Sequence, residues 1–521
     1  MRPGNAFSAV RFPVSAGGGS HPLQRAGNLS FAVLAAVAVV LVLAWVIVER
    51  TDLWRYSLAA LALVNLLALS IRWPRFAVIG AFLFLPFVAL IRRLLIADAG
   101  FESNDPLLLV GPLLAVVLLA RFWLLEKRPF LTDALSKLVF ALLLVALAQV
   151  FNPVGVGGIR GGAVGLLFVG VPLLWFFVGR EIGDRRTSWL ILGIAIGIAM
   201  LVAAYGLWQT ELRQVLPPWD KEWFDTNGYS GLVVGNEYTQ QLRPFSTFSS
   251  NAEYGTYASI GAAIAVAFAL HRRIWALLAL PLLLPAIFFA GSRGIMVLGV
   301  AGIIVALALK ARRIWVAWLI VAVGVGAAIG LTTVLSAQLE RAAGQSGDPL
   351  AARTVAGLTN PLSEQQSTAT LHWESIVASV ETGFEEPLGT GSGASNLAAD
   401  QLAEGRLETE NDLADAFRNF GFVGGLLFLA IIVMALKKVG RRAIRLRDPI
   451  AVAVGALLVA NLGFWGEGGH YATSALMWFL MGAATRPQDE LTAGYVSSMK
   501  SKRGESDSPA PPGRIGVRPS P

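Results

Sequence analysis

The chain has 521 residues, of which 55% are hydrophobic and 15% are charged, and its formal net charge is +8. Soluble domains carry about a quarter charged residues, so this composition excludes an ordinary soluble protein. The positive charge lies in short segments between apolar runs, so no nucleic-acid partner is expected. Because the chain contains no cysteine, disulfides and thiol chemistry are also excluded.

The apolar residues fall into runs of about 20, the length at which a helix crosses the hydrocarbon core of a bilayer. They predict an all-α, polytopic membrane protein of about fourteen transmembrane helices with two long extracytoplasmic loops. The predicted helices lie near 30–49, 53–71, 75–97, 106–125, 136–152, 160–179, 187–208, 252–270, 274–290, 294–310, 314–335, 417–436, 449–466 and 470–485.

These helices divide the chain into seven parts. They are an N-terminal cytoplasmic tail (1–29), an N-terminal transmembrane bundle (30–208), a first outer loop (209–251), a second set of helices (252–335), a large and partly helical outer loop (336–416), the C-terminal helices (417–485) and a disordered cytoplasmic tail (486–521). Most of the 42 lysines and arginines then fall on the cytoplasmic side, as the positive-inside rule requires. Both termini are therefore expected in the cytoplasm.

Arg92 and Arg93 fall inside the third predicted helix, where charge is costly. A broken or shifted helix is the favoured interpretation, and two cations lining a transport pathway are the alternative.

Two outer segments place an arginine at the mouth of a helix. Arg243 begins Arg-Pro-Phe-Ser-Thr-Phe and is followed by Asn251, and Ser292 and Arg293 stand between two glycines. Helix N-termini and arginine forks both bind phosphate, which favours capture of an anion. The alternative for the first segment is a helix N-cap with a snorkelling arginine, and for the second it is a tight outer hairpin with its arginine at the headgroups.

Two further outer segments lie near the end of the large loop. Residues 387–393, Pro-Leu-Gly-Thr-Gly-Ser-Gly, can cradle an anion or form a flexible loop, and they match no nucleotide-binding signature. Glu410, Asn411 and Asp412 form an acidic cluster before a span. Glu410 is a candidate general base, and a solvated acidic helix start is the alternative.

The first outer loop carries Trp219 and Trp223, whose faces suit either sugar rings or the membrane interface. The four histidines have no paired spacing, so neither a metal site nor a cofactor is expected.

In this order, the four segments resemble the signature of the O-antigen ligase/polymerase family of bacterial envelope enzymes. The resemblance runs from Arg243-Pro-Phe-Ser-Thr-Phe through Ser292-Arg293-Gly294 and Pro387-Leu-Gly-Thr-Gly391 to Glu410-Asn411-Asp412, and covers about 240–435. It departs from the family where Glu410 replaces a histidine, and where no arginine precedes Trp373.

The resemblance implies a metal-independent glycosyltransferase of the bacterial inner membrane. Such an enzyme moves glycan from an undecaprenyl-pyrophosphate or similar polyprenyl carrier to a glycan or lipid-glycan acceptor. Arg243 and Arg293 would stabilise the leaving pyrophosphate, Glu410 would act as base, and Arg353, Asn251, Ser292, Asn411, Asp412, Trp219 and Trp223 would contact substrate. Membrane lipid surrounds such a protein.

Two other functions stay open. A transporter or flippase would place its binding groups near the middle of the bilayer. A non-catalytic scaffold would use the outer loops to bind other envelope-assembly proteins.

Overall fold

The computed structural model describes residues 53–100, 105–153, 155, 158–212, 216–227, 233–234, 241–311, 314–334, 338, 341, 349–359, 369–393, 411–465 and 471–487. The predicted first helix at 30–49, the tail at 1–29 and all but two residues of the tail at 486–521 lie outside these ranges.

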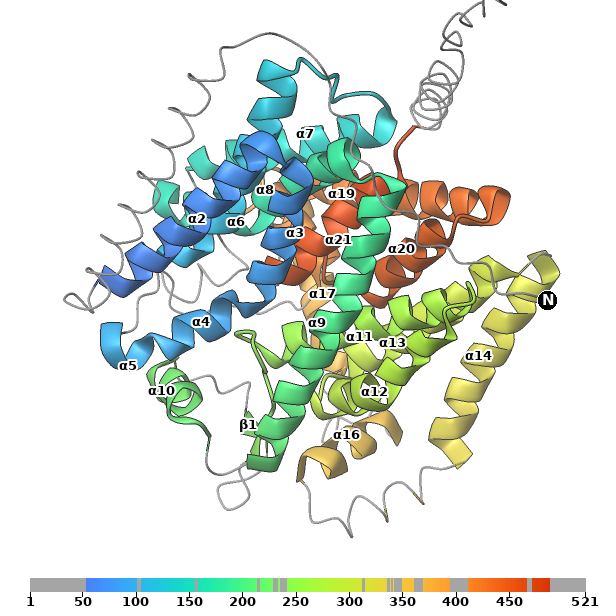
Figure 1. Cartoon of the computed structure of the whole chain (residues 1–521). Helices are drawn as coiled ribbons and strands as arrows, with labels where there is room; N and C mark the ends of the chain where they lie inside the picture. Colours follow the sequence, from blue (N-terminus) through green and yellow to red (C-terminus); the bar gives the residue numbers. More distant parts are fainter. Residues whose placement is uncertain are drawn as a thin grey trace, which may run out of the picture.

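The described part of the chain is a helical bundle, with one short β-hairpin formed by β1 (Val233–Val234) and β2 (Gln241–Leu242) (Figure 1). Its first half contains α2 (Trp54–Arg72), α3 (Pro74–Phe84), α4 (Val88–Leu94), α5 (Ile96–Ala99), α6 (Val110–Ala120), α7 (Ala134–Ala148), α8 (Gly158–Ile182), α9 (Arg185–Leu212) and α10 (Pro218–Asn227). The second half contains α11 (Asn251–Ala269), α12 (Leu280–Phe289), α13 (Arg293–Lys310), α14 (Ile314–Val334), α16 (Pro349–Thr359), α17 (Ala369–Glu385), α19 (Asp412–Leu446), α20 (Pro449–Ala460) and α21 (Tyr471–Ala484). Short 3-10 or π turns extend several of them at Leu85–Phe87, Pro106–Leu109, Arg121–Leu125, Gln149–Phe151 and Ile274–Ala279.

Eight helical stretches in the described ranges are long and apolar enough to cross a membrane. They are Trp54–Arg72, Pro74–Leu94, Pro106–Leu125, Ala134–Phe151, Gly158–Ile182, Arg185–Leu212, Arg293–Lys310 and Asp412–Leu446. Shorter apolar helices cover Ile274–Phe289, Trp315–Ala327, Pro449–Ala460 and Tyr471–Ala484. The chain is therefore a helical, multi-pass type of membrane protein, and the larger number of fourteen spans stays a prediction.

Three helices differ in detail from the sequence-based expectation. The stretch at 75–97 is broken after Phe84 by a 3-10 turn that contains Pro86, so the broken-helix interpretation is confirmed. Helix α19 begins at Asp412 rather than 417, and Gly421 kinks it with a φ of 67°. Helix α20 ends at Ala460, several residues before the expected 466.

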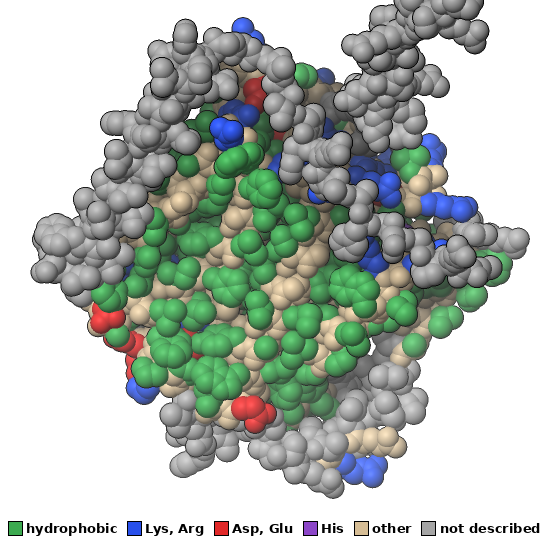
Figure 2. Space-filling model, in the orientation of Figure 1, with side chains coloured by type: hydrophobic (Ala, Val, Ile, Leu, Met, Phe, Trp, Pro, Cys, Tyr) green, Lys and Arg blue, Asp and Glu red, His purple; other side chains and the backbone are tan. Residues whose placement is uncertain are grey.

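The molecule has two distinct ends (Figure 1). Helices α10 and α16 and the β-hairpin lie together at the lower end of the view, which we call the loop end. The opposite end holds the last turns of α8 and α21 and the start of α9, and we call it the basic end. Hydrophobic side chains cover the middle of the face seen in Figure 2, whereas Lys and Arg gather mainly towards the basic end.

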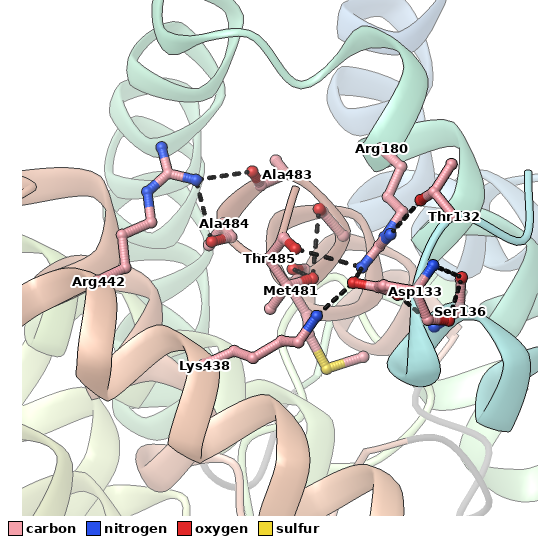
Figure 3. Close-up of polar contacts among 11 residues, drawn as sticks. Thr132, Asp133, Ser136, Arg180, Lys438, Arg442, Met481, Ala483, Ala484 and Thr485 are labelled. Carbon is pink, nitrogen blue, oxygen red and sulfur yellow. Dashed lines mark hydrogen bonds and ion pairs between the residues drawn. The ribbon is translucent and has the colours of Figure 1, made fainter. Parts of the chain in front are cut away.

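A half-buried carboxylate ties several helices together at the basic end (Figure 3). Asp133 caps α7 by accepting a hydrogen bond of 2.8 Å from Ser136 N, and it forms ion pairs with Arg180 of α8 and Lys438 of α19. Arg180 also donates to the carbonyl of Thr485, just past α21, over 3.2 Å. A single side chain therefore links the ends of α7, α8 and α19, and indirectly of α21.

We expect Asp133→Asn to destabilise the detergent-solubilised protein by about 3 kcal/mol or more, because Arg180 is left buried without its counter-charge. Burial alone would raise the pKa of the Asp133 carboxyl, but hydrogen bonds from Arg180 and Lys438 outweigh it and hold that pKa well below its usual 3.8. The stabilisation is therefore complete above about pH 5 and is lost as the pH falls towards the lowered pKa.

Thermal unfolding between about pH 3 and pH 7, where carboxylates titrate, measures both the loss of stability and its dependence on pH. The variant should depend less on pH in the acid range than the wild type. Asp225→Asn is the matched control, because Asp225 and its partner Lys221 are both exposed, and it should change stability by less than about 1 kcal/mol. Equal acid sensitivity of the wild type and Asp133→Asn would contradict the assignment.

Candidate functional site

The segment that follows Arg243 is held in place by a buried guanidinium. Arg93, which is fully buried, donates hydrogen bonds to the carbonyls of Ser246 and Phe248, and its Nε lies 2.8 Å from Asp220 of α10. The Phe245 ring packs against the same guanidinium, 4.8 Å from it. A charge buried this deeply is tolerated because a counter-charge and two carbonyls surround it.

A second side chain, Gln209 of α9, holds the same segment from the other side. Its Oε1 accepts from the backbone N–H of Phe245 at 3.1 Å and of Ser246 at 2.7 Å, and its Nε2 donates to Asp220 at 2.7 Å. Ser246 has a φ of 54°, a left-handed conformation that is unfavourable for a residue with a side chain. These contacts therefore impose one turn on the backbone after Arg243.

The neighbouring Arg92 belongs to a different cluster. Its Nε lies 3.2 Å from Asp105, which also pairs with the buried Arg55 of α2. Arg55 donates in addition to the carbonyl of Gly100. The two adjacent arginines are thus anchored to different carboxylates, which accounts for both charges within an apolar stretch.

Three of the predicted anion-binding residues come together at the loop end. Gly291 has a φ of 69°, and a Cβ added there would lie 3.5 Å from Cδ of Arg243 and 3.0 Å from Leu350 of α16. Two residues on, Arg293 is the first residue of α13, and the charge of Arg353 on α16 acts on its guanidinium. Helix α16 carries the exposed Arg353 and packs on α12, α13 and α14, the helices next to the half-buried Arg293.

The two polar residues of the same segments have structural contacts. Asn251 donates from Nδ2 to the carbonyl of Ala290 over 2.8 Å and so ties the start of α11 to the end of α12. Ser292 occupies the N-cap position of α13, although its side chain makes no capping hydrogen bond.

The acidic segment lies at the start of α19. Asn411 is the N-cap and accepts from the backbone N–H of Leu413 and Ala414, whereas the buried Asp412 donates its own N–H to the carbonyl of Gly463 over 2.8 Å. Glu410, the candidate base, lies just outside the described residues. Its neighbours therefore place the segment against the connection between α20 and α21.

Sequence reasoning did not assign a role to Glu253. This buried carboxylate accepts from the backbone N–H of Ala472 at 3.1 Å and of Thr473 at 3.5 Å, so it caps the N-terminus of α21 from another helix. The start of α11 thereby contacts the first turn of α21, whereas Asp412 contacts Gly463, just past the end of α20. A carboxylate in the first turn of an apolar helix is energetically costly. That unfavourable position was the feature of the sequence that could have identified Glu253.

The glycine-rich segment is a backbone clamp. Thr390 and Gly391 donate to the carbonyls of Arg418 and Asn419, and Asn152 donates to the carbonyl of Gly389 over 2.8 Å. A Cβ at Gly421 would collide with the carbonyl of Pro387. The glycines let this segment pack directly on the kink of α19, so the structure gives it a packing role.

Trp219 and Trp223 differ in burial and in their contacts. Trp223 is buried with Ile96 and Phe245, and the Arg92 guanidinium lies 5.8 Å from its ring, so its faces are used in packing. Trp219 is half-buried and donates from Nε1 to Tyr205 over 3.0 Å. Of the two, Trp219 retains more surface for a ligand.

A scan against protein-family models finds no match to this chain, and no curated protein matches it. Among the described residues, no group of three or more His, Cys, Asp or Glu side chains could hold a metal ion.

We expect Arg93→Gln to destabilise the protein by about 3–5 kcal/mol, because Asp220 is left buried and unpaired. Arg93→Gln combined with Asp220→Asn should recover much of this loss. Because the chain lacks cysteine, a spin label on Ser249→Cys reports the segment directly. The label should be more mobile in both variants than in the wild-type background, since both lack the guanidinium fork. An immobile label in the double variant would show that Arg93 does not position the segment.

Proposed function

We propose that this chain transfers or polymerises glycan from a polyprenyl-pyrophosphate carrier, as its resemblance to the O-antigen ligase/polymerase family implies. The observation that carries the proposal is the gathering of Arg243, Arg293 and Arg353 from three separate segments at the loop end. The charge of Arg353 acts on the like charge of Arg293, and a diphosphate bound between such cations relieves their repulsion. Arginine forks also match the oxygen geometry of a pyrophosphate.

The proposed reaction needs two further groups. An acceptor hydroxyl gives its proton to Glu410 as its oxygen forms a bond to the anomeric carbon of the donor sugar. The bond from that carbon to the pyrophosphate oxygen breaks, and the electron pair leaves with the pyrophosphate, where the arginines stabilise it. Trp219 offers a ring face to the sugar, and Asn251 and Ser292 lie beside the arginines at the helix mouths.

The proposed reaction takes place on the outer side of the membrane. The loop end faces outward from a bacterial inner membrane, fourteen helices cross it, and both termini lie in the cytoplasm. The donor is the lipid-linked glycan, the acceptor is a second glycan or a lipid-glycan, and no metal or cofactor takes part. The transport alternative loses its main support, because Arg92 and Arg93 are both engaged by carboxylates.

We expect Arg243→Ala and Arg293→Ala each to lower turnover about a hundredfold or more, because each removes stabilisation of the leaving group. Arg185→Ala, an exposed arginine at the basic end, is the control and should keep full activity. Glycan chain length in the native host, read at equal protein levels, measures the effect. In the same assay, normal turnover of Glu410→Gln would remove Glu410 as the base.

A pair of glycine substitutions tests the arrangement with all arginines present. Gly291→Ala places a methyl group against Leu350 and Arg243 at a positive φ, whereas a Cβ at Gly294 meets open space. Gly291→Ala should therefore shorten the glycan, and Gly294→Ala should leave it unchanged. Full-length polymer in Arg243→Ala, Arg293→Ala and Gly291→Ala would refute the proposed function.

A further inference from the structure

One exposed stripe runs along α19 and changes character part-way. Its first part is apolar, with Val423 61% exposed, Leu426 44%, Leu429 38% and Val433 56%. From there the same stripe continues through Lys437, Arg441 and Arg445, all exposed. The steps of three or four residues keep all these side chains on one face of the helix.

The cations on the neighbouring, inward face are already engaged. Lys438 pairs with Asp133, and Arg442 donates to the carbonyl of Ala484 over 3.0 Å (Figure 3). Arg442 also pairs with Asp448 over 2.6 Å. Lys437 and Arg441 each lie one residue before these positions, and they are exposed, as is Arg445. Within the described ranges, no carboxylate forms an ion pair with Lys437, Arg441 or Arg445.

The other carboxylates at the basic end are also engaged by the protein itself. Glu126 pairs with Arg121 and Arg128, Glu181 with Arg128, and Asp184 with Arg75. The exposed row on α19 therefore adds positive charge that the described carboxylates of this end do not balance.

The length of α19 places this row at a membrane surface. From the kink at Gly421 to Leu446 the helix is about 38 Å long, which exceeds the roughly 30 Å of the hydrocarbon core. The stripe changes from apolar at Val433 to cationic at Lys437 within about one helical turn. This distance is similar to that over which a bilayer changes from hydrocarbon to headgroups. The three cations then cover about 12 Å along the axis, which spans the headgroup layer of one leaflet, roughly 5–8 Å thick, and reaches past it.

We propose that this stripe binds an anionic phospholipid of the leaflet at the basic end. The acyl chains lie along Leu426, Leu429 and Val433, and the phosphate contacts Lys437, Arg441 and Arg445. The continuity of the apolar and cationic parts favours a lipid, because a phospholipid joins the same two chemistries in the same order. Basic clusters at the end of a membrane helix attract anionic lipids by about 1 kcal/mol per cation.

The test uses the purified full-length chain in detergent, titrated with phosphatidylglycerol or with phosphatidylcholine. Native mass spectrometry counts the retained lipid, and thermal unfolding measures the stabilisation. The wild type should prefer phosphatidylglycerol. The triple variant Lys437→Gln, Arg441→Gln, Arg445→Gln should lose about a hundredfold of that preference, because about fivefold is expected for each cation.

The matched control removes three exposed cations at the same end that lie outside α19, as Lys127→Gln, Lys137→Gln, Arg185→Gln, and should keep the preference. If the triple variant on α19 is not monodisperse, Arg441→Gln alone should lose about fivefold. Equal preference in the wild type and the α19 variants would overturn the proposal. So would stabilisation by inorganic phosphate that matches that by phosphatidylglycerol, since the stripe would then bind an anion and not a lipid. None of these results depends on glycan transfer, so the proposal stands or falls separately from the proposed function.

Discussion

The buried guanidinium of Arg93 is the constraint on which the loop end depends. It joins Asp220 of α10 to the backbone of Ser246 and Phe248, and the adjacent Arg92 is joined to Asp105. The broken helix at 85–99 therefore carries two anchors that face different parts of the bundle. Because a buried charge without its partners costs several kcal/mol, the segment after Arg243 has one arrangement that satisfies Arg93 and Gln209 together.

Much of the helical layout could be predicted from the sequence, because runs of apolar residues select helices in a membrane-type chain. The details that depend on distant contacts could not. Asp220 lies more than a hundred residues from Arg93, and nothing in either neighbourhood indicates the partner. Likewise, Gly421 lies within an apolar run, and its kink is explained only by the carbonyl of Pro387 packed against it. Trp223 looked like a ligand platform because its surroundings are polar in sequence, yet it packs against Ile96 and Phe245.

The four motif segments have different physical roles in the folded chain. The segments at Arg243 and Arg293 supply cations to one cluster, and Gly291 lets Arg243 and α16 approach each other. The glycine-rich segment and Asn411 instead fix the start and the kink of α19. Helix α19 thus extends from the acidic segment at its start to the lipid-facing cations at its last turns. The arrangement of charge at the two ends follows from a few carboxylates, chiefly Asp220 and Asp133, each of which engages cations from other elements.

We propose that both long loops lie on the outer side of the membrane and that the basic end lies in the cytoplasm. The absence of native cysteine allows a direct measurement with single substitutions at exposed positions, Lys221→Cys on α10, Trp373→Cys on α17 and Arg445→Cys on α19. A membrane-impermeant maleimide applied to intact cells should label Lys221→Cys and Trp373→Cys, and should label Arg445→Cys only after the membrane is opened. Labelling of Arg445→Cys in intact cells, or of only one of the two loop positions, would contradict the account.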